Sequence, residues 1–345
     1  MPRQRRIWEE LSVFESHDYV SKWYHTRHKR SLNSSRTREI ASCFTQGKEY
    51  FHSAENAAAS VRPLLLYYGV LSLSRGLVLL RDKTKSEASL KPSHGLEVVD
   101  WNGTLSGGIS NVLDLEVRAT SGTFEELVNA TANTQATGWW STPSMSVGTF
   151  SHSLKQPNML HDRSKVSLES LTSRDHRFLS LYNKTTGRAS KIHHVEIVAE
   201  ATSLEISVVA VGRANDRSVV EKCFGWPEGT QVSSRTSMRR LPFPNHYVRL
   251  EGSSLNDLKP LLPATQYVGG DGMFIIEDFE NGDRLSELLR TFLLSYFLGM
   301  LVRYYPSRWI SLLRNEKGDS AQPILLSAVN AIEDEYPILV AGALS

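Results

Sequence analysis

The chain has 345 residues, of which 40% are hydrophobic and 22% charged, so it belongs to the globular class and can bury one large core or two moderate ones. Its 39 lysines and arginines nearly balance its 37 aspartates and glutamates. This balance excludes a global electrostatic attraction to nucleic acid or membranes, so any such contact must be local.

The cysteines and the apolar segments of the chain indicate the cellular compartment in which we expect the protein. Cys43 and Cys223 are the only cysteines, which excludes a disulfide framework or a cysteine-type zinc site and favours a reducing compartment. The N-terminal residues lack the apolar core of a secretory signal. The longest apolar run, Thr291 to Val302, is shorter than the roughly 20 residues that cross a bilayer. We therefore expect a cytoplasmic protein without membrane contact.

Helical periodicity covers the N-terminal part of the chain. Apolar residues predict an amphipathic helix over about the first 25 residues, broken near Ser16. Asn33 offers an N-cap to a second helix, in which Gly47 indicates close packing. A third helix is apolar almost all round from Leu64 to Leu80, except for Ser72, Ser74 and Arg75, so we place it in the middle of a bundle.

From Leu96 to about Phe279 the pattern is typical of strands and hairpins. We predict hairpins from residues 195–199 with 204–211 and from 266–268 with 273–276, and helical pieces near 123–132, 168–181 and 217–224. The polar segment 138–165 is predicted to be an exposed loop or lid.

Helical periodicity returns after Asp283. Pro306 is expected to break this helix, and a last helix over 323–335 precedes a short apolar tail at 338–344. We therefore predict an α+β fold. Residues 1–96 and 280–345 form a helical bundle domain, and residues 97–279 form a β-rich inserted lobe.

Two blocks of the sequence resemble the YaaC-like family of bacterial proteins. They are RPLLLYYGVLSLSRGLVLL with the following HGL (Arg62 to Leu80 and His94 to Leu96) and LLSYFLGMLVRYYPSRW (Leu293 to Trp309). The resemblance spans most of the helical part and implies a fold, without implying an established activity.

A second pattern, Tyr67-Tyr68 followed by Ser74-Arg75 and His94-Gly95, is similar to the middle helix pair of HEPN domains. Many of these domains cleave RNA or accompany nucleotidyltransferases in prokaryotic conflict systems. The catalytic ones carry an arginine and, four to six residues later, a histidine on one helix. The late helix of this chain instead offers RYYPSRW, Arg303 to Trp309, without a histidine, which argues against ribonuclease activity.

Arg75 and His94 are the first candidate site residues. An arginine on an apolar helix is costly to bury unless it is paired, so Arg75 meets either a carboxylate from another helix or an anionic ligand. His94 is the candidate catalytic residue, as a general base near neutral pH. The alternative for His94 is a capping or packing role at a loop end.

Arg303, Arg308 and Trp309 form the second candidate group, because arginine and aromatic side chains clamp phosphates and stack on bases. The alternative is a helix end packed by aromatic residues. Basic residues at 3–6 and 27–38, interleaved with Trp23 and Tyr24, form a local nucleic-acid footprint or a solvated helix face. His194, Glu196 and Glu200 share a strand face, which suits a metal or a solvated surface; we expect no metal.

We expect a non-catalytic intracellular binding or regulatory protein with a cleft near Arg75, His94 and Arg303 that accepts an anion, either a nucleotide or a nucleic-acid strand. The HEPN likeness implies a bacterial defence or stress module. One alternative is a metal-independent ribonuclease in which His94, or a histidine of 138–165, replaces the missing helical one. Another is a structural subunit of a larger complex. We expect a protein partner and no cofactor, and homo-oligomerisation stays open.

Overall fold

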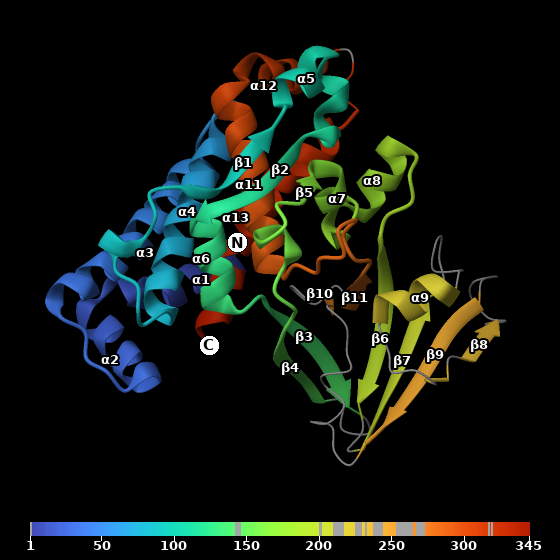
Figure 1. Cartoon of the computed structure of the whole chain (residues 1–345), viewed down its shortest axis with the longest axis horizontal. Helices are drawn as coiled ribbons and strands as arrows, with labels where there is room; N and C mark the ends of the chain where they lie inside the picture. Colours follow the sequence, from blue (N-terminus) through green and yellow to red (C-terminus); the bar gives the residue numbers. More distant parts are fainter. Residues whose placement is uncertain are drawn as a thin grey trace. The chain divides into compact units, whose positions relative to one another are not determined.

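The computed structural model describes residues 2–141, 146–199, 202–209, 217–224, 230–231, 233–236, 244–252, 265–266, 273–316, 318 and 320–345. The chain divides into two compact units, drawn in Figure 1. The helical unit comprises Met1–Asn133, Gln156–Leu171 and Glu287–Ser345, and the β unit comprises Thr134–Lys155 and Thr172–Ser286.

The helical unit contains helices from both ends of the chain and three short strands. Its elements are α1 (Pro2–Ser12), α2 (His17–His28), α3 (Ser34–Glu55), α4 (Arg62–Arg81), β1 (His94–Val99), α5 (Trp101–Ser106), β2 (Glu116–Gly122), α6 (Thr123–Thr131), β5 (Lys165–Ser167), α7 (Leu168–Thr172), α11 (Glu287–Tyr304), α12 (Pro306–Leu313) and α13 (Gln322–Leu344).

Helix α4 lies at the centre of this unit and packs against α3, α6, α11 and α13 (Figure 1). Leu66, Leu73 and Leu77 of α4 are fully buried, as expected for a helix that is apolar all round. Close approach of α3 depends on Gly47, because a Cβ there would lie 2.7 Å from Leu73 Cδ2. The predicted position of this helix is confirmed.

Polar contacts join α4 to α13, more than 200 residues later in the chain. Ser74 Oγ lies 2.5 Å from Tyr336 Oη, and both side chains are fully buried. Arg62 forms an ion pair with Glu333. The α+β fold, with a bundle built from both ends of the chain, is therefore confirmed.

The ends of the predicted helices follow local sequence signals. Ser16, where the first helix was expected to break, is the N-cap of α2, and its side chain accepts a hydrogen bond from the backbone N–H of Tyr19. Asn33 caps α3 in the same way by accepting from Arg36. Pro306 begins α12 just after α11, because proline fits the first turn of a helix without the loss of a hydrogen bond.

The predicted apolar tail at 338–344 is wrong, because α13 is one helix that continues through Pro337 to Leu344. Proline removes a helical hydrogen bond and normally ends a helix. In α13 the residues beyond the proline include buried Val340 and Leu344, and their burial in the bundle offsets the lost hydrogen bond.

The helical unit also contains a three-stranded antiparallel sheet in the order β1-β2-β5. Helix α6 packs against β1, β2 and α4, which ties the sheet to the bundle. Residues 97–133 and 156–171 consequently belong to the helical unit, whereas they were predicted to lie in the inserted lobe. The last boundary lies before Glu287 rather than at residue 280.

The β unit is built on an eight-stranded sheet with the path β10-β11-β6-β7-β9-β8, in which β3 pairs with β4 and β6. Pairing is antiparallel except between β3 and β6. Its elements are β3 (Thr134–Ser141), β4 (Ser146–Ser153), α8 (Leu179–Thr186), β6 (Ile192–Ala199), β7 (Ser203–Val209), α9 (Arg217–Phe224), β8 (Ser233–Thr236), β9 (Pro244–Glu251), β10 (Thr265–Gln266) and β11 (Met273–Ile276).

Both predicted hairpins are present as antiparallel pairs, β6 with β7 and β10 with β11. The loop expected over 138–165 is wrong up to Ser153, because β3 and β4 pair from Thr134↔Ser153 to Ser141↔Ser146. Residues 154–164 contain no strand and one 3-10 turn, as expected for a loop. The segment is polar, but its threonines, its one valine and its aromatic residues favour strands. The predicted helix over 168–181 is two short helices, α7 and α8, with a 3-10 turn between them.

Helix α4 is the one helix in the described part of the chain that is long and apolar enough to cross a membrane, with 72% of its most apolar window buried inside the protein. That burial is what a core helix shows, and it agrees with the contacts of α4 with α3, α6, α11 and α13.

Candidate functional site

His94 is the first residue of β1, and the backbone next to it determines where its side chain points. Gly95 has φ +78°, and a Cβ there would lie 2.6 Å from the backbone nitrogen of Phe124. The register between β1 and β2 shifts between His94 and Leu96. Such irregularities redirect side chains, and here the half-buried imidazole reaches Tyr67 of α4.

Tyr67 and His94 share a short hydrogen bond, with Tyr67 Oη 2.5 Å from His94 Nδ1. Burial raises the pKa of Tyr67, so the phenol keeps its proton. Burial lowers the pKa of His94, and the positive charge of Arg303 lowers it further. The imidazole is therefore neutral at pH 7. Since Nδ1 is the only hydrogen-bond partner of the Tyr67 hydroxyl among the described residues, we infer that the hydroxyl donates and that His94 carries its proton on Nε2.

Arg303 lies near His94 because of the geometry of α11. Tyr296, whose ring centroid is 5.9 Å from that of His94, precedes Arg303 by seven residues, which is two helical turns. Arg303 is exposed, and its Nη1 donates to Tyr68 Oη at 3.2 Å. Among the described residues no carboxylate lies within ion-pair distance of Arg303. The arrangement places a cation without a counter-ion beside a neutral imidazole.

The lowered pKa of His94 predicts a pH dependence of stability. The unfolded chain takes up a proton near the ordinary pKa of 6.5, whereas the folded protein resists protonation. The contribution of His94 is therefore complete above that value and is lost as the pH falls from 6.5 through the folded pKa. We expect His94→Asn to remove this part of the slope in urea unfolding at different pH values. An unchanged slope in the variant would contradict the assignment.

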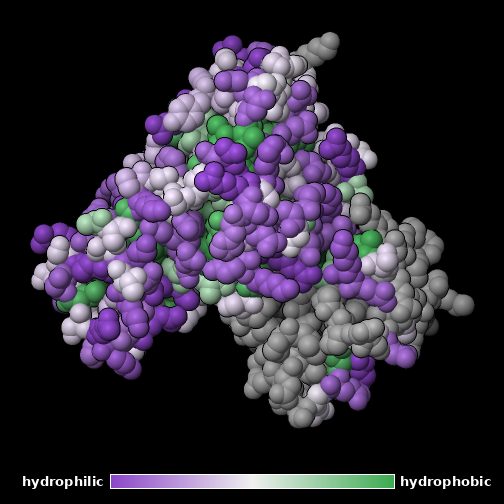
Figure 2. Space-filling view, viewed as in Figure 1, coloured by the Kyte–Doolittle hydropathy of each residue, from purple (hydrophilic) through white to green (hydrophobic). Residues whose placement is uncertain are grey.

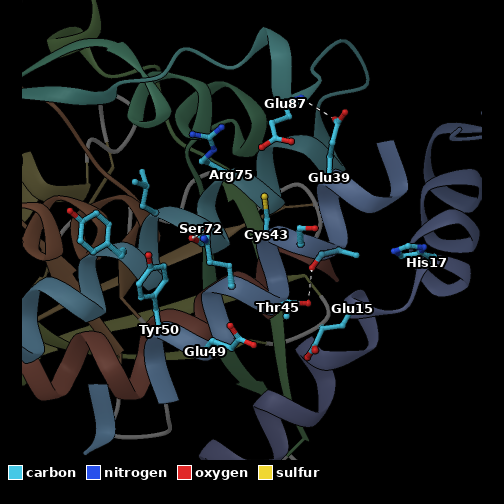
Figure 3. A pocket seen from close by; sticks show the side chains of 15 residues that line it. Glu15, His17, Glu39, Cys43, Thr45, Glu49, Tyr50, Ser72, Arg75 and Glu87 are labelled. Atoms are coloured by element: carbon cyan, nitrogen blue, oxygen red, sulfur yellow. Dashed lines mark hydrogen bonds between the residues drawn. The ribbon is translucent and has the colours of Figure 1, made fainter. Parts of the chain in front are cut away.

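Arg75, the third residue of the expected cleft, lies in a different setting. It lines a cavity of about 590 Å³ between α3, α4 and neighbouring segments, shown in Figure 3. Four glutamates also line the cavity: Glu15, Glu39, Glu49 and Glu87. This excess of carboxylates makes the cavity negative and repels phosphate. Tyr68 lines the same cavity and bonds to Arg303, but the structure brings only His94 and Arg303 into one anion-accepting arrangement.

Trp309 and Arg308 differ in what they offer a ligand. Trp309 is 1% exposed, and its Nε1 donates to the backbone carbonyl of Ala59 at 3.0 Å. Its ring is thus committed to packing α12 against the segment before α4. Arg308 is half-buried on α12. Of the two roles considered for Trp309, ligand stacking and packing of a helix end, the structure fits packing.

The two adjacent histidines of β6 point in opposite directions. His193 is buried, with Nε2 3.1 Å from Glu277 Oε1, and His194 is exposed. Glu200, the last residue of the considered metal set, lies outside the described residues. In the part of the chain that the structure describes, no group of three or more histidine, cysteine or acidic side chains has the arrangement of a metal site.

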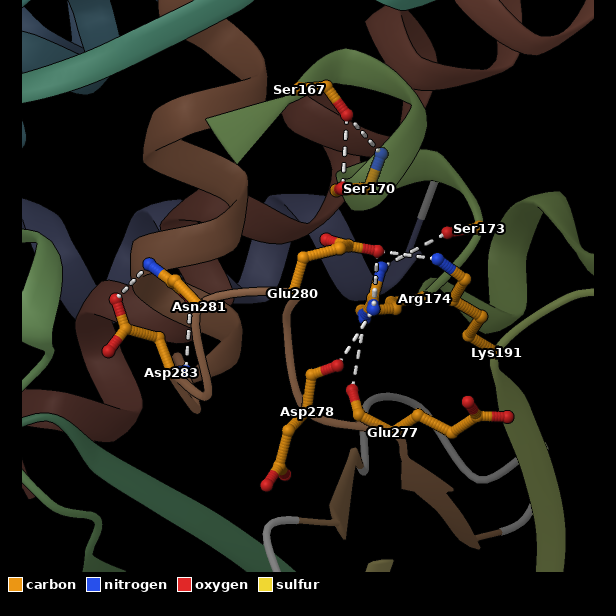
Figure 4. Close-up of polar contacts among 10 residues, drawn as sticks. All are labelled: Ser167, Ser170, Ser173, Arg174, Lys191, Glu277, Asp278, Glu280, Asn281 and Asp283. Atoms are coloured by element: carbon orange, nitrogen blue, oxygen red, sulfur yellow. Dashed lines mark hydrogen bonds and ion pairs between the residues drawn. The ribbon is translucent and has the colours of Figure 1, made fainter. Parts of the chain in front are cut away.

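A buried arginine in the β unit, Arg174, was not among the predicted site residues. Arg174 is 2% exposed and donates to the carbonyls of Glu277 at 3.0 Å and Asp278 at 2.7 Å, as Figure 4 shows. Its guanidinium also pairs with Glu280 at 3.1 Å, and Lys191 reaches the same carboxylate. Arg174 fixes the segment after β11. No local motif marks it, because its partners are about 100 residues away.

The fold and the site define an α+β protein whose helical unit holds a half-buried histidine beside an exposed arginine. The model of the YaaC-like protein family matches residues 12–344, nearly the whole chain. The chain belongs to the YaaC-like protein family, and the resemblance found in its two helical blocks is confirmed. Comparison with curated proteins and with solved structures gave no match.

Proposed function

We propose that this protein is a non-catalytic binding or regulatory protein that holds a phosphate-bearing ligand, a nucleotide or a nucleic-acid strand, at Arg303 and His94. The observation that supports the proposal is the exposed guanidinium of Arg303, which has Tyr68 as a hydrogen-bond partner and no carboxylate partner among the described residues. Arginine binds phosphate by charge-assisted, often bidentate hydrogen bonds.

His94 complements Arg303 as a hydrogen-bond donor. Its Nδ1 is occupied by Tyr67, so Nε2–H is the group that can face an anion. A general base would instead need an unprotonated nitrogen toward the substrate. This geometry favours binding over catalysis.

Titration with ATP, followed by calorimetry and by NMR of His94, tests the proposal. We expect Arg303→Gln to weaken binding by about 10- to 100-fold, which corresponds to the loss of about 1.5–3 kcal/mol from a hydrogen bond to a charged group. We also expect bound phosphate to raise the pKa of His94, because it neutralises the charge of Arg303 that lowers this pKa.

Arg314→Gln is the matched control, because Arg314 is an exposed arginine of the same unit beyond α12. It should leave both the affinity and the pKa of His94 unchanged. Equal affinity of Arg303→Gln and the original protein for ATP, and for an oligonucleotide, would reject the site.

RNA cleavage is the second candidate function, supported by a half-buried histidine with a lowered pKa next to an arginine. Incubation with labelled RNA separates the two functions. Cleavage by the original protein that disappears in His94→Ala would favour the nuclease, and binding without cleavage would favour the binding protein.

The biological setting that accompanies the proposal is a cytoplasmic bacterial defence or stress module with a protein partner, as the HEPN likeness implies. Co-transcribed genes for a nuclease, an ATPase or a nucleotidyltransferase would support it. An obligate structural subunit would present a large apolar face. On the face drawn in Figure 2, the hydrophobic residues of the described part form small separate patches, which gives that alternative no support there.

A further inference from the structure

A groove of about 450 Å³ lies along α2, at the edge of the helical unit, and is lined by Tyr19, Lys22, Trp23, Thr26 and Arg27 with the end of α13. Residues three and four positions apart share one face of a helix, so Tyr19, the pair Lys22 and Trp23, and Arg27 form a continuous row. The lining thus combines two aromatic rings with two cations, next to the terminal residue Ser345.

The aromatic rings of the groove are held by neighbouring side chains and remain partly exposed, and His28 also contacts Trp23 edge to face with ring centroids 6.3 Å apart. Phe14 contacts Tyr19 and Trp23 edge to face, with ring centroids 5.2 and 6.0 Å apart. Tyr19 is 40% exposed, and Trp23 is half-buried. Rings fixed in this way lose little conformational entropy when a flat group stacks on them.

The charges along α2 and the following turn are mostly positive, and Asp18 is the single acidic residue there. Lys22, Arg27, Lys29 and Arg30 are all exposed, and among the described residues no carboxylate lies within ion-pair distance of any of them. The guanidinium of Arg27 lies 5.5 Å from the centre of the Trp23 ring. A phosphate bound to Arg27 would consequently lie next to a base stacked on Trp23.

We propose that this groove binds single-stranded nucleic acid, with a base stacked on Trp23 and phosphates at Lys22 and Arg27. Aromatic platforms beside cations are the chemistry by which proteins bind single strands without reading their sequence. An anionic membrane also attracts cations and aromatic rings, but it needs rings that project outward, whereas Trp23 is half-buried and lines a groove.

The proposal is separate from the proposed function, because the groove shares no residue with the site at Arg303 and His94. The two can therefore fail independently. The probe here is a fluorescein-labelled oligouridylate, whose bases can stack, whereas the site at Arg303 is followed through ATP and the pKa of His94.

Fluorescence anisotropy with the full chain gives the test. We expect Trp23→Ala to weaken oligouridylate binding by about 5- to 100-fold, and Trp23→Phe to retain most of the affinity, because phenylalanine also stacks. Arg27→Gln should weaken binding and reduce the slope of log Kd against log salt by about 0.7, the value expected for one phosphate contact with a single strand. Arg314→Gln, the control, should leave both quantities unchanged.

Thermal unfolding of each variant separates lost binding from lost folding, and Arg27→Gln tests the groove if Trp23→Ala does not fold. Unchanged affinity in both Trp23→Ala and Arg27→Gln would overturn the proposal, as would equal losses in Arg314→Gln. Loss of binding in Arg303→Gln alone would assign the strand to the other site. Binding to phosphatidylserine vesicles that depends on Trp23, without binding to the oligonucleotide, would overturn the proposal in favour of a membrane surface.

Discussion

Replacement of Trp309 by alanine is expected to lower the free energy of unfolding by about 3–5 kcal/mol, the range for truncating a large buried aromatic residue. Trp309 is 1% exposed, so the change leaves a cavity under α12. It also removes the indole donor to the carbonyl of Ala59, which leaves an unsatisfied acceptor. Urea unfolding of the full chain measures the loss.

The neighbouring residue provides the control. Arg308 is half-buried, so Arg308→Gln should change the free energy of unfolding by no more than about 0.5 kcal/mol. Trp309→Phe should lie between the two, because it keeps most of the apolar volume and loses the hydrogen bond. If Trp309→Ala keeps the original stability but loses affinity for ATP or oligouridylate, Trp309 belongs to a ligand site after all.

Arg174→Met is expected to destabilise the β unit by about 2–4 kcal/mol, because two backbone carbonyls lose a charged donor at about 1–2 kcal/mol each. The affected carbonyls, Glu277 and Asp278, follow directly after β11. Hydrogen exchange should therefore show faster exchange of the amides in β11. Urea unfolding gives the corresponding loss of free energy.

Lys191→Met is the matched control for Arg174→Met. Both cations contact Glu280, whose side chain is 57% exposed. An ion pair in which one side chain is mostly exposed to water contributes at most about 1 kcal/mol to the free energy of unfolding. Equal losses in the two variants would show that the ion pair with Glu280, rather than the bonds to the backbone, accounts for the role of Arg174.

The parts of the fold that the sequence predicted best depend on local signals. Helix α4 was expected over Leu64 to Leu80 and runs from Arg62 to Arg81, because its long apolar pattern is contained in the segment itself. The β3–β4 hairpin was missed because its polar residues resemble a loop. Its pairing partners determine its structure, and pairing is not visible in either strand alone.

The candidate site was predictable to the extent that Arg303 lies on such a helix. Arg303 and His94 were both named. His94 is the first residue of β1, and its contacts with Tyr67 of α4 and Tyr296 of α11 place it near Arg303. Arg75 was grouped with them because it lies on α4, but the four glutamates around it come from α3, the segment before α2 and the loop after α4. The bond between Tyr67 and His94 depends on the irregular backbone at Gly95, which spacing alone does not reveal.

The central position of α4 has a consequence for synthesis on the ribosome. Helices α3 and α4 are complete by Arg81, but α11, which covers another face of α4, begins only at Glu287. At about 5–20 residues per second, roughly 10–40 s pass before that covering helix is made. During this interval the nascent chain exposes the face of α4 that α11 and α13 will cover, while α3 and α6 can already pack on the rest of the helix. We therefore expect chaperones to bind this face during translation.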